Sequence, residues 1–297
     1  MTDTPDILCI GSVLWDIIGR SPAAMPLGAD VPGRITRLPG GVALNIAMTL
    51  RRFGLRPALL SAVGRDPEGE ELVAACIRMG LETGMLYRSV DLPTDRYMAV
   101  EGASGLVAAI ADAHSLEAAG ERILLPLSDG RLGSAKAPWQ GLIALDGNLT
   151  EALLSDIVAS PLFAAADLRV APASPGKAER LLPLLSHRRA MLYVNLEEAG
   201  ILCHTRFSSA PEAAQGLMAR GAYRVLVTDG GKVCADGMAG QPVITDMPPP
   251  VLVTRVTGAG DTFMAAHIAA EQRGADRIGA LGAALRAAAD YVSGDIG

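Results

Sequence analysis

The chain has 297 residues, 50% of them hydrophobic, which is enough to bury the core of one large α/β domain or of two ordinary ones. A formal net charge of −6 and scattered Lys and Arg residues argue against binding the phosphate backbone of a nucleic acid. The sequence starts without a basic segment followed by an apolar one, and no stretch approaches the ~20 uninterrupted apolar residues of a membrane span. We therefore expect a cytoplasmic protein that contacts neither nucleic acid nor membrane.

Short apolar runs alternate with amphipathic stretches along the chain, a pattern typical of strands covered by helices on both faces. The pattern predicts a mainly parallel sheet whose strands, each followed by a helix, cover residues 7–13, 57–63, 142–146, 168–171, 191–195 and 223–228. A further helix is predicted over 276–292. Residues 115–140 contain many turn formers and no clear period, so no element is predicted there. The cysteines form no CxxC pair and have no histidine at metal-ligand spacing, so we expect all four to be reduced, buried core residues: Cys9, Cys76, Cys203 and Cys234.

Two segments, residues 15–38 and 88–111, interrupt the alternation. The first is rich in Pro and Gly, and the second contains strand-like runs at 97–101 and 106–111. We expect them to form one small β lid. The lid carries more apolar side chains than a solvated flap needs, which favours a homodimer over packing on the main domain of a monomer. These side chains are Tyr97, Met98, Val100, Leu106, Val107 and Ile110.

A glycine-rich turn, Thr-Gly-Ala-Gly-Asp-Thr-Phe at residues 257–263, follows a strand-like run at 251–253 and opens a helical run over 263–272. Such a turn presents unpaired N–H groups at the positive end of a helix, which suits a phosphate. In phosphoryl transfer a carboxylate can orient the attacking hydroxyl and accept its proton, and Asp261 is placed to do so. In isolation the motif more often means only that Asp261 caps the helix. A P-loop is excluded because no GxxxxGK[ST] occurs.

A second glycine-rich helix start, Gly-Gly-Val-Ala-Leu-Asn-Ile-Ala, occupies residues 40–47. Together with Gly11, the Asn195-x-x-Glu198 motif and the late Gly-Ala-Gly-Asp, it resembles the PfkB-type, or ribokinase-like, carbohydrate kinases over essentially the whole chain. The resemblance implies one domain over residues 1–297: a ribokinase-like three-layer α/β/α sandwich with a mainly parallel central sheet and a small β lid.

The resemblance also implies a role for each matching position. Asp261 would be the catalytic base, and the anion hole would be formed by Gly258, Ala259 and Gly260. Hydroxyls of the acceptor would be held by Asp16, Gly41 and Asn45, although a turn residue at Asp16 and a helix-start hydrogen bond at Asn45 are the structural alternatives. ATP would contact Asn195, Thr228, Gly230, Gly231 and Ala284. Glu198 would hold Mg²⁺ through water, with Glu197 as the adjacent competitor.

Further stretches resemble the pseudouridine kinase branch of that family: Val256 before the Thr-Gly-Ala-Gly-Asp, and residues 107–112, 146–149 and 171–178. They favour a nucleoside acceptor with Lys177 as a contact, although an exposed lysine at a helix start is an equal alternative. Arg255 and Val256 replace the Asp and the hydroxyl residue near which many members bind a monovalent cation. Potassium activation is therefore not expected.

The sequence thus predicts an ATP-dependent phosphotransferase acting on a primary hydroxyl, with the 5′-hydroxyl of pseudouridine as the favoured acceptor. A kinase for a free sugar such as ribose, fructose or a keto-deoxy sugar acid is the alternative within the family. A non-catalytic nucleotide or sugar sensor of the same fold is less consistent with the intact Asp261 and the two glycine turns. A Rossmann dehydrogenase is not supported, since Gly11 begins no GxGxxG.

Overall fold

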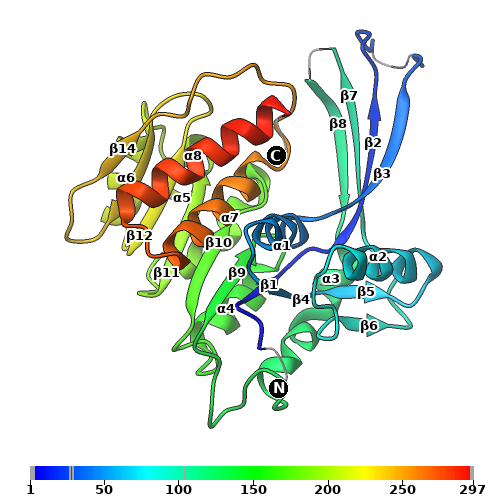
Figure 1. Cartoon of the computed structure of the whole chain (residues 1–297), viewed down its shortest axis with the longest axis horizontal. Helices are drawn as coiled ribbons and strands as arrows, with labels where there is room; N and C mark the ends of the chain where they lie inside the picture. The colour runs from blue at the N-terminus through cyan, green and yellow to red at the C-terminus, as the bar shows by residue number, and fades with distance from the viewer. Residues whose placement is uncertain (1–3, 27, 29, 104, 295–297) are drawn as a thin grey trace.

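The computed structural model describes residues 4–26, 28, 30–103 and 105–294, and its centre is an eight-stranded sheet (Figure 1). The strand order is β14-β13-β12-β11-β10-β9-β1-β4. Six strands are parallel: β4 (Pro57–Leu60), β1 (Ile7–Ile10), β9 (Leu142–Asp146), β10 (Asp167–Ala171), β11 (Ala190–Asn195) and β12 (Arg224–Thr228). Two antiparallel strands extend the sheet, β13 (Cys234–Met238) and β14 (Ile244–Asp246). The prediction of a mainly parallel central sheet is confirmed.

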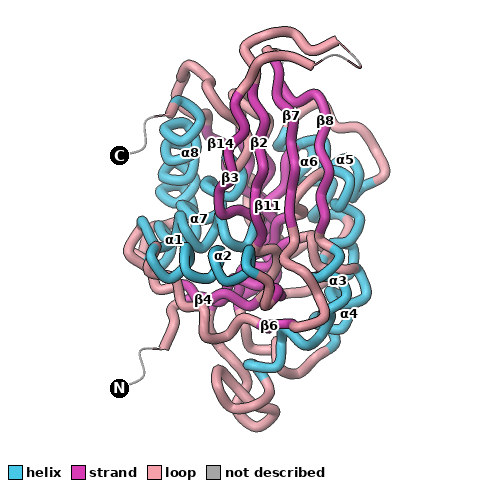
Figure 2. Tube along the Cα trace, turned by 90° about the vertical axis from the view of Figure 1, so that its right-hand side faces the viewer, coloured by secondary structure: helices cyan, strands magenta, loops and turns pink. Residues whose placement is uncertain are grey.

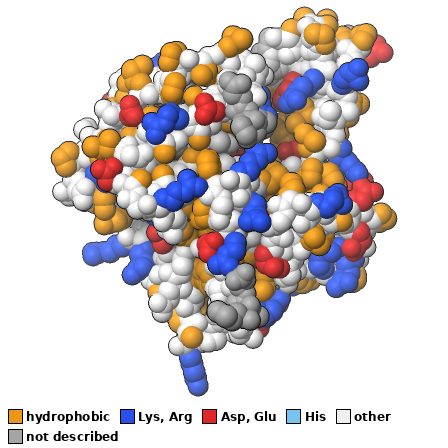
Figure 3. Space-filling view, in the orientation of Figure 1, with side chains coloured by type: hydrophobic (Ala, Val, Ile, Leu, Met, Phe, Trp, Pro, Cys, Tyr) orange, Lys and Arg blue, Asp and Glu red, His pale blue; other side chains and the backbone are white. Residues whose placement is uncertain are grey.

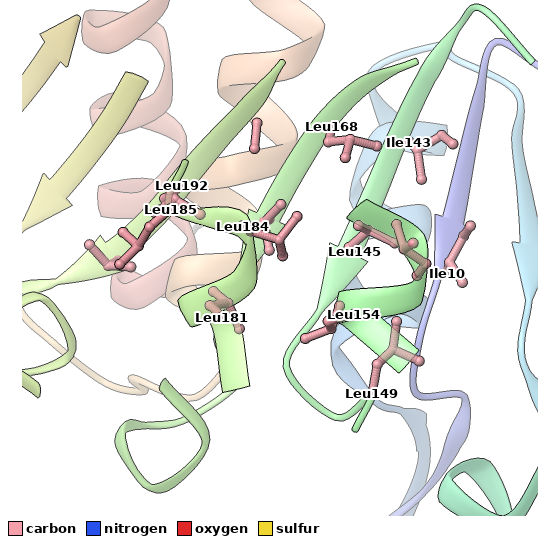
Figure 4. Packing of buried hydrophobic residues seen from close by; sticks show 14 of the residues in the cluster. Ile10, Ile143, Leu145, Leu149, Leu154, Leu168, Leu181, Leu184, Leu185 and Leu192 are labelled. Atoms are coloured by element: carbon pink, nitrogen blue, oxygen red, sulfur yellow. The ribbon is translucent and has the colours of Figure 1, made fainter. Parts of the chain in front are cut away.

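Helices cover both faces of this sheet, and each face has its own apolar core. Successive strand residues point to opposite faces, so Ile7 and Cys9 belong to one core whereas Leu8 and Ile10 belong to the other. The first face packs against α1 (Val42–Arg52), α2 (Pro67–Arg78), α7 (Ala259–Gln272) and α8 (Arg277–Ser293). The second packs against α3 (His114–Ala119), η1 (Gly120–Leu127), α4 (Glu151–Ala159), η2 (Pro175–Leu184), α5 (Leu196–Cys203) and α6 (Ala210–Ala219). Figure 4 shows the leucine-rich packing of this second core. No helix in the described ranges is both long and apolar enough to cross a membrane.

The lid is a separate four-stranded sheet in the order β3-β2-β7-β8 (Figure 2). It combines β2 (Leu14–Arg20) and β3 (Arg34–Gly40) with β7 (Arg96–Gly102) and β8 (Gly105–Asp112). The segments join because β2 pairs in parallel with β7, with paired residues such as Trp15 and Arg96 lying 81 positions apart in sequence. Residues 88–95 lie outside this sheet: β6 (Tyr87–Ser89) pairs with β5 (Ala62–Gly64) beside the main domain.

Several local predictions were wrong. The apolar run 251–253 is not a strand, and Leu252 is 83% exposed; the three prolines at 248–250 lack the N–H that a strand ladder requires. β12 is followed by the antiparallel β13 rather than by a helix, and the run 57–63 divides between β4 and β5 in two sheets. Residues 115–140, for which no element was predicted, contain most of α3 and all of η1. Cys203 is half-buried, unlike the other three free cysteines.

Candidate active site

The N-terminal and C-terminal glycine motifs meet in space although 216 positions separate their polar side chains. Asn45 is the fourth residue of α1, and Asp261 is the third residue of α7, which packs on α1. The Asn45 Nδ2 donates a hydrogen bond of 2.9 Å to Asp261 Oδ2. Both helices begin beyond the carboxyl edge of a mainly parallel sheet, the edge at which α/β proteins usually bind ligands. The contact therefore identifies the candidate active site.

Asp261 has the electrostatic character of a general base that works near neutral pH. Removal from water raises the pKa of its carboxyl to about 7, against the opposing effect of the hydrogen bond from Asn45. The negative charges of Asp146, Asp16 and Glu198 raise this pKa further. A carboxylate in such surroundings gains a proton more readily than an exposed one, which is the property that proton abstraction requires.

The turn before Asp261 is built so that only glycine fits at its first position. Gly258 is the N-cap of α7 with φ 88°, and a Cβ there would lie 2.6 Å from the Tyr291 hydroxyl. That hydroxyl donates a 2.9 Å hydrogen bond to the carbonyl oxygen of Thr257. The Arg255 guanidinium stacks 3.9 Å from the Tyr291 ring and donates through Nε to the Tyr291 carbonyl oxygen. Tyr291 and Arg255 thus brace the turn from the α8 side.

The acceptor side of the site brings Asp16 against the glycines of the N-terminal motif. Asp16 is half-buried in β2, and burial raises the pKa of its carboxyl to about 6. A Cβ on Gly40 would lie 2.0 Å from Asp16 Oδ2, and a Cβ on Gly41, whose φ is 97°, would lie 2.5 Å from the Ser12 carbonyl oxygen. Only glycine at positions 40 and 41 therefore leaves room for the Asp16 carboxylate and for the Ser12 backbone.

Lys177 is half-buried rather than an exposed lysine at a helix start. Its Nζ donates a hydrogen bond to Asn148 Oδ1, and loss of hydration lowers the pKa of its ammonium, against the opposing charge of Asp146. Sequence reasoning gave no role to Ser12 or Asp146, which lie at the centre of this region. The available signal was an aspartate that ends the otherwise apolar and fully buried strand β9, where a parallel sheet presents its carboxyl edge.

Most of the predicted nucleotide-binding residues lie at the ends of adjacent strands. Asn195 and Thr228 are paired neighbours at the carboxyl ends of β11 and β12. Gly230 has φ 57°, and neither it nor Gly231 would bring a Cβ within 4 Å of another residue, so the turn has open space beside it. Ala284, in contrast, is fully buried in the core between α7, α8 and the sheet. The structure does not place Ala284 at the surface of a site, because its methyl group fills the helix packing.

Glu198 fits a cation held through water better than one held directly. It forms a capping box with Asn195, whose backbone N–H donates to Glu198 Oε2 at 2.8 Å while the Asn195 side chain accepts from the Glu198 N–H at 2.9 Å. Burial raises the pKa of the Glu198 carboxyl to about 7, whereas Glu197 is exposed. Within the described ranges, no group of three or more His, Cys, Asp or Glu side chains could surround a metal ion. A Mg²⁺ ion that keeps most of its waters needs only one such carboxylate besides phosphate oxygens.

Comparison with known proteins agrees with this geometry. Residues 4–293 match the family model of the pfkB family carbohydrate kinases. Among curated proteins, the pseudouridine kinase of Escherichia coli K12 is 36% identical over 81 residues, which are 27% of this chain and 26% of that protein. A nucleoside kinase of Methanothermobacter thermautotrophicus is 39% identical over 72 residues, 24% of this chain and 23% of that protein. The match thus spans about a quarter of each of these relatives.

Solved structures match over nearly the whole length. A carbohydrate kinase from Agrobacterium tumefaciens has a TM-score of 0.78 at 27% identity, with 95% of this chain and 89% of that chain covered. The ribokinase of Arabidopsis thaliana, solved with ribose and ATP, has a TM-score of 0.78 at 20% identity, with 97% and 93% covered, and supports the fold. From the family match over residues 4–293, we conclude that the chain belongs to the pfkB family of carbohydrate kinases.

Proposed function

We propose that the protein transfers the γ-phosphoryl group of ATP to a primary hydroxyl of a sugar or nucleoside. The observation that carries this proposal is the hydrogen bond between Asn45 and Asp261. It brings the proposed acceptor-binding residue of α1 next to the proposed catalytic base, which follows the glycine-rich turn at the start of α7. A protein that only senses nucleotide or sugar has no need of a carboxylate whose pKa is raised to about 7 at that position.

In the proposed mechanism, Asp16 and Asn45 hold the acceptor hydroxyls, and the Asp261 carboxylate accepts the proton of the attacking hydroxyl. The hydroxyl oxygen then bonds to the γ-phosphorus while the bond to the β-phosphate oxygen breaks, which releases ADP. The amides of Gly258 and Gly260 stabilise the charge on the transferred group, whereas the Ala259 N–H, also predicted for this role, already donates to the Val256 carbonyl oxygen at 3.0 Å. Glu198 would hold Mg²⁺ through water, and the bound ion would supply positive charge beside the phosphates. The lid excludes water, which would otherwise compete as acceptor.

We further propose a nucleoside acceptor, with pseudouridine favoured. The partial likenesses to a pseudouridine kinase and a nucleoside kinase support this class, as does the inward placement of Lys177 on Asn148, where its ammonium can meet a base carbonyl. A requirement for a monovalent cation is not proposed, because the guanidinium of Arg255 is fixed beside the anion-binding turn. Cytoplasmic location remains the expectation from sequence.

The proposed substrate is tested by measuring kcat/KM for each acceptor separately. With MgATP, kcat/KM for pseudouridine should exceed that for ribose and for fructose, measured by coupled ADP release. Lys177→Ala should reduce the ratio of kcat/KM for pseudouridine to kcat/KM for ribose, since only the nucleoside carries a base for Lys177 to contact. A kcat/KM for ribose equal to or above that for pseudouridine would assign the protein to the free-sugar kinases of the family.

We also propose that the lid pairs with a second copy of the chain. Strand register separates its two faces: Asp16 lies opposite Tyr97, on the side of the acceptor, so Ile17, Met98 and Ile110 lie together on the other side. Met98 is 46% exposed and Ile110 64% exposed, and hydrophobic side chains gather on the lid in Figure 3. Since β3 and β8 also leave open sheet edges, a twofold pairing would cover both features.

The lid interface is tested by the mass of the protein in solution. The parent should be a dimer at micromolar concentration, and Met98→Asp with Ile110→Asp should make it monomeric in light scattering, because two charges per copy would be buried. Ile278→Asp, at an equally exposed isoleucine on α8, is the matched control and should remain dimeric. A monomeric parent, or a dimer that persists with both lid charges, would contradict lid pairing.

A further inference from the structure

The backbone N–H groups at the glycine-rich start of α1 bind other parts of the protein. At α1 the first three N–H groups are already bonded: Val42 N donates to Ser12 Oγ at 2.8 Å, Ala43 N to Asp146 Oδ2 at 3.0 Å and Leu44 N to the Ser12 carbonyl oxygen at 3.3 Å. Such groups have no partner within a helix and often bind an anionic ligand. At α1, the protein itself supplies the anion, namely the Asp146 carboxylate.

Asp146 is fully buried, and its carboxylate accepts four hydrogen bonds from three separate segments. Oδ2 accepts from the Ser12 N–H at 2.8 Å, the Ser12 hydroxyl at 2.8 Å and the Ala43 N–H, while Oδ1 accepts from the Asn148 N–H at 2.8 Å. Gly11 must be glycine for this to occur, because a Cβ there would lie 2.3 Å from the carboxyl carbon of Asp146. The carboxylate thus ties the ends of β1 and β9 to the start of α1.

Ser12 completes the arrangement. Its hydroxyl donates to Asp146 and accepts from both Val42 N and the Asn148 side chain, the latter at 2.9 Å. The Asn148 side chain in turn accepts from Lys177 Nζ. A continuous series of hydrogen bonds therefore runs from Lys177, the proposed contact of the nucleoside's base, through Asn148 and Ser12 to the start of α1, which carries Asn45.

A buried carboxylate with no ion pair is unfavourable unless hydrogen bonds and dipoles replace its hydration. Here four donors and the positive end of α1 do so, and charge-assisted bonds of this kind are stronger than neutral ones. Apolar residues would fill the same space without that desolvation cost. What the Asp146 carboxylate provides instead is a fixed backbone position at Ala43, two residues before Asn45.

We propose that Asp146 is a positioning residue for phosphoryl transfer: as a built-in anion at the start of α1, it locks the acceptor turn so that Asn45 meets both Asp261 and the acceptor. The role rests on the proposed function, since it assumes that this turn holds the acceptor. Asp146 itself is enclosed by protein and touches no substrate. Its loss should therefore impair acceptor binding and leave ATP binding at the α7 turn intact.

The experiment compares Asp146→Asn and Ser12→Ala with the parent. An asparagine keeps one oxygen but presents an amide donor to a second N–H group, so the turn loses its charged acceptor. KM for the acceptor should rise about tenfold or more in Asp146→Asn, with KM for ATP within about threefold of the parent. Ser12→Ala, the milder change, should move the acceptor KM in the same direction by a smaller factor.

Asp236→Asn is the matched control, because Asp236 is also a fully buried aspartate but is bonded to Arg224 and Arg277 away from the site. It should lose stability without raising the acceptor KM. An acceptor KM within twofold of the parent in Asp146→Asn, or a parallel rise in both KM values, would overturn the proposal.

Hydrogen exchange tests the turn independently of turnover. Peptides covering residues 41–50 should exchange faster in Asp146→Asn than in the parent and in Asp236→Asn. Unchanged exchange would overturn the positioning role even in an active enzyme. A parent that phosphorylates no acceptor would refute the proposed function, while the exchange comparison would still decide whether Asp146 locks the turn.

Discussion

Asp261→Asn is expected to bind ATP like the parent but to lose phosphoryl transfer by about 100-fold or more, the usual effect of removing a general base. Asparagine has the same shape and can still accept the hydrogen bond from Asn45, so the site should keep its geometry. The melting temperature should not fall, because one negative charge is removed from the vicinity of Asp146, Asp16 and Glu198. The measurement is kcat with saturating MgATP and acceptor, beside ATP binding by calorimetry.

The pH profile distinguishes a base from a merely structural carboxylate. Because the pKa of Asp261 is raised to about 7, its carboxyl is protonated below that pH and cannot accept a proton. In the parent, kcat/KM for the acceptor should fall about tenfold or more per pH unit below pH 7, because the Glu198 and Asp16 carboxyls, with pKa values raised to about 7 and about 6, also gain protons there. In Asp261→Asn the fall should be shallower, since one of the three carboxyls is gone. Asp290→Asn, at an exposed position on α8, is the control and should retain the parent profile. Turnover of Asp261→Asn within tenfold of the parent would contradict the assignment.

Gly258→Ala is expected to lower kcat/KM for ATP by about 100-fold, comparable to the loss of an anion-stabilising donor. The new methyl group would overlap the Tyr291 hydroxyl, at 2.6 Å, and the stacked Arg255 guanidinium restricts the ring from moving aside. The turn must then shift, and its N–H groups would no longer point at the same position. The measurement is the steady-state rate as a function of MgATP at a saturating acceptor concentration.

Gly274→Ala provides the matched control for backbone strain. Gly274 has φ 87°, close to the 88° of Gly258, but a Cβ there meets no atom within 4 Å. Both variants should lose about 1 kcal/mol of stability from the left-handed conformation, whereas only Gly258→Ala should lose ATP turnover. Equal ATP kinetics in the two variants would show that the turn before Asp261 does not bind phosphate.

The sequence was sufficient for the parallel sheet because buried strands such as β1 and β9 contain short, continuous apolar runs. It was insufficient where an apolar run does not form a strand. Residues 251–253 are as apolar as a strand, but they are exposed after three prolines, and hydrophobicity alone does not distinguish the two situations. The hairpin of β13 and β14 was missed because Cys234–Met238 contains Asp236, which is buried as the partner of Arg224 on the neighbouring strand β12 and of Arg277 on α8.

The site was predictable to the extent that it consists of motifs. Asp261 and Asn45 were identified by their glycine-rich surroundings and by family resemblance, but local spacing carries no information about a contact across 216 positions. Asp146 was noticed only as part of the family-like stretch 146–149, and no role was predicted for it, because one aspartate at the end of a strand resembles an ordinary turn residue. Its role depends on Ser12 and Ala43, which only the folded chain brings to it.

The central claim is that this site moves a phosphoryl group from ATP to a primary hydroxyl. Phosphorus-31 NMR of the parent with MgATP and pseudouridine measures this directly, because the product and inorganic phosphate give separate signals. The account predicts that the γ-phosphate signal is replaced by ADP and by one phosphomonoester coupled to the 5′ protons, and that Asp261→Asn forms this product at least about 100-fold more slowly. Conversion of ATP to ADP and inorganic phosphate alone, with every nucleoside and sugar supplied, would contradict it.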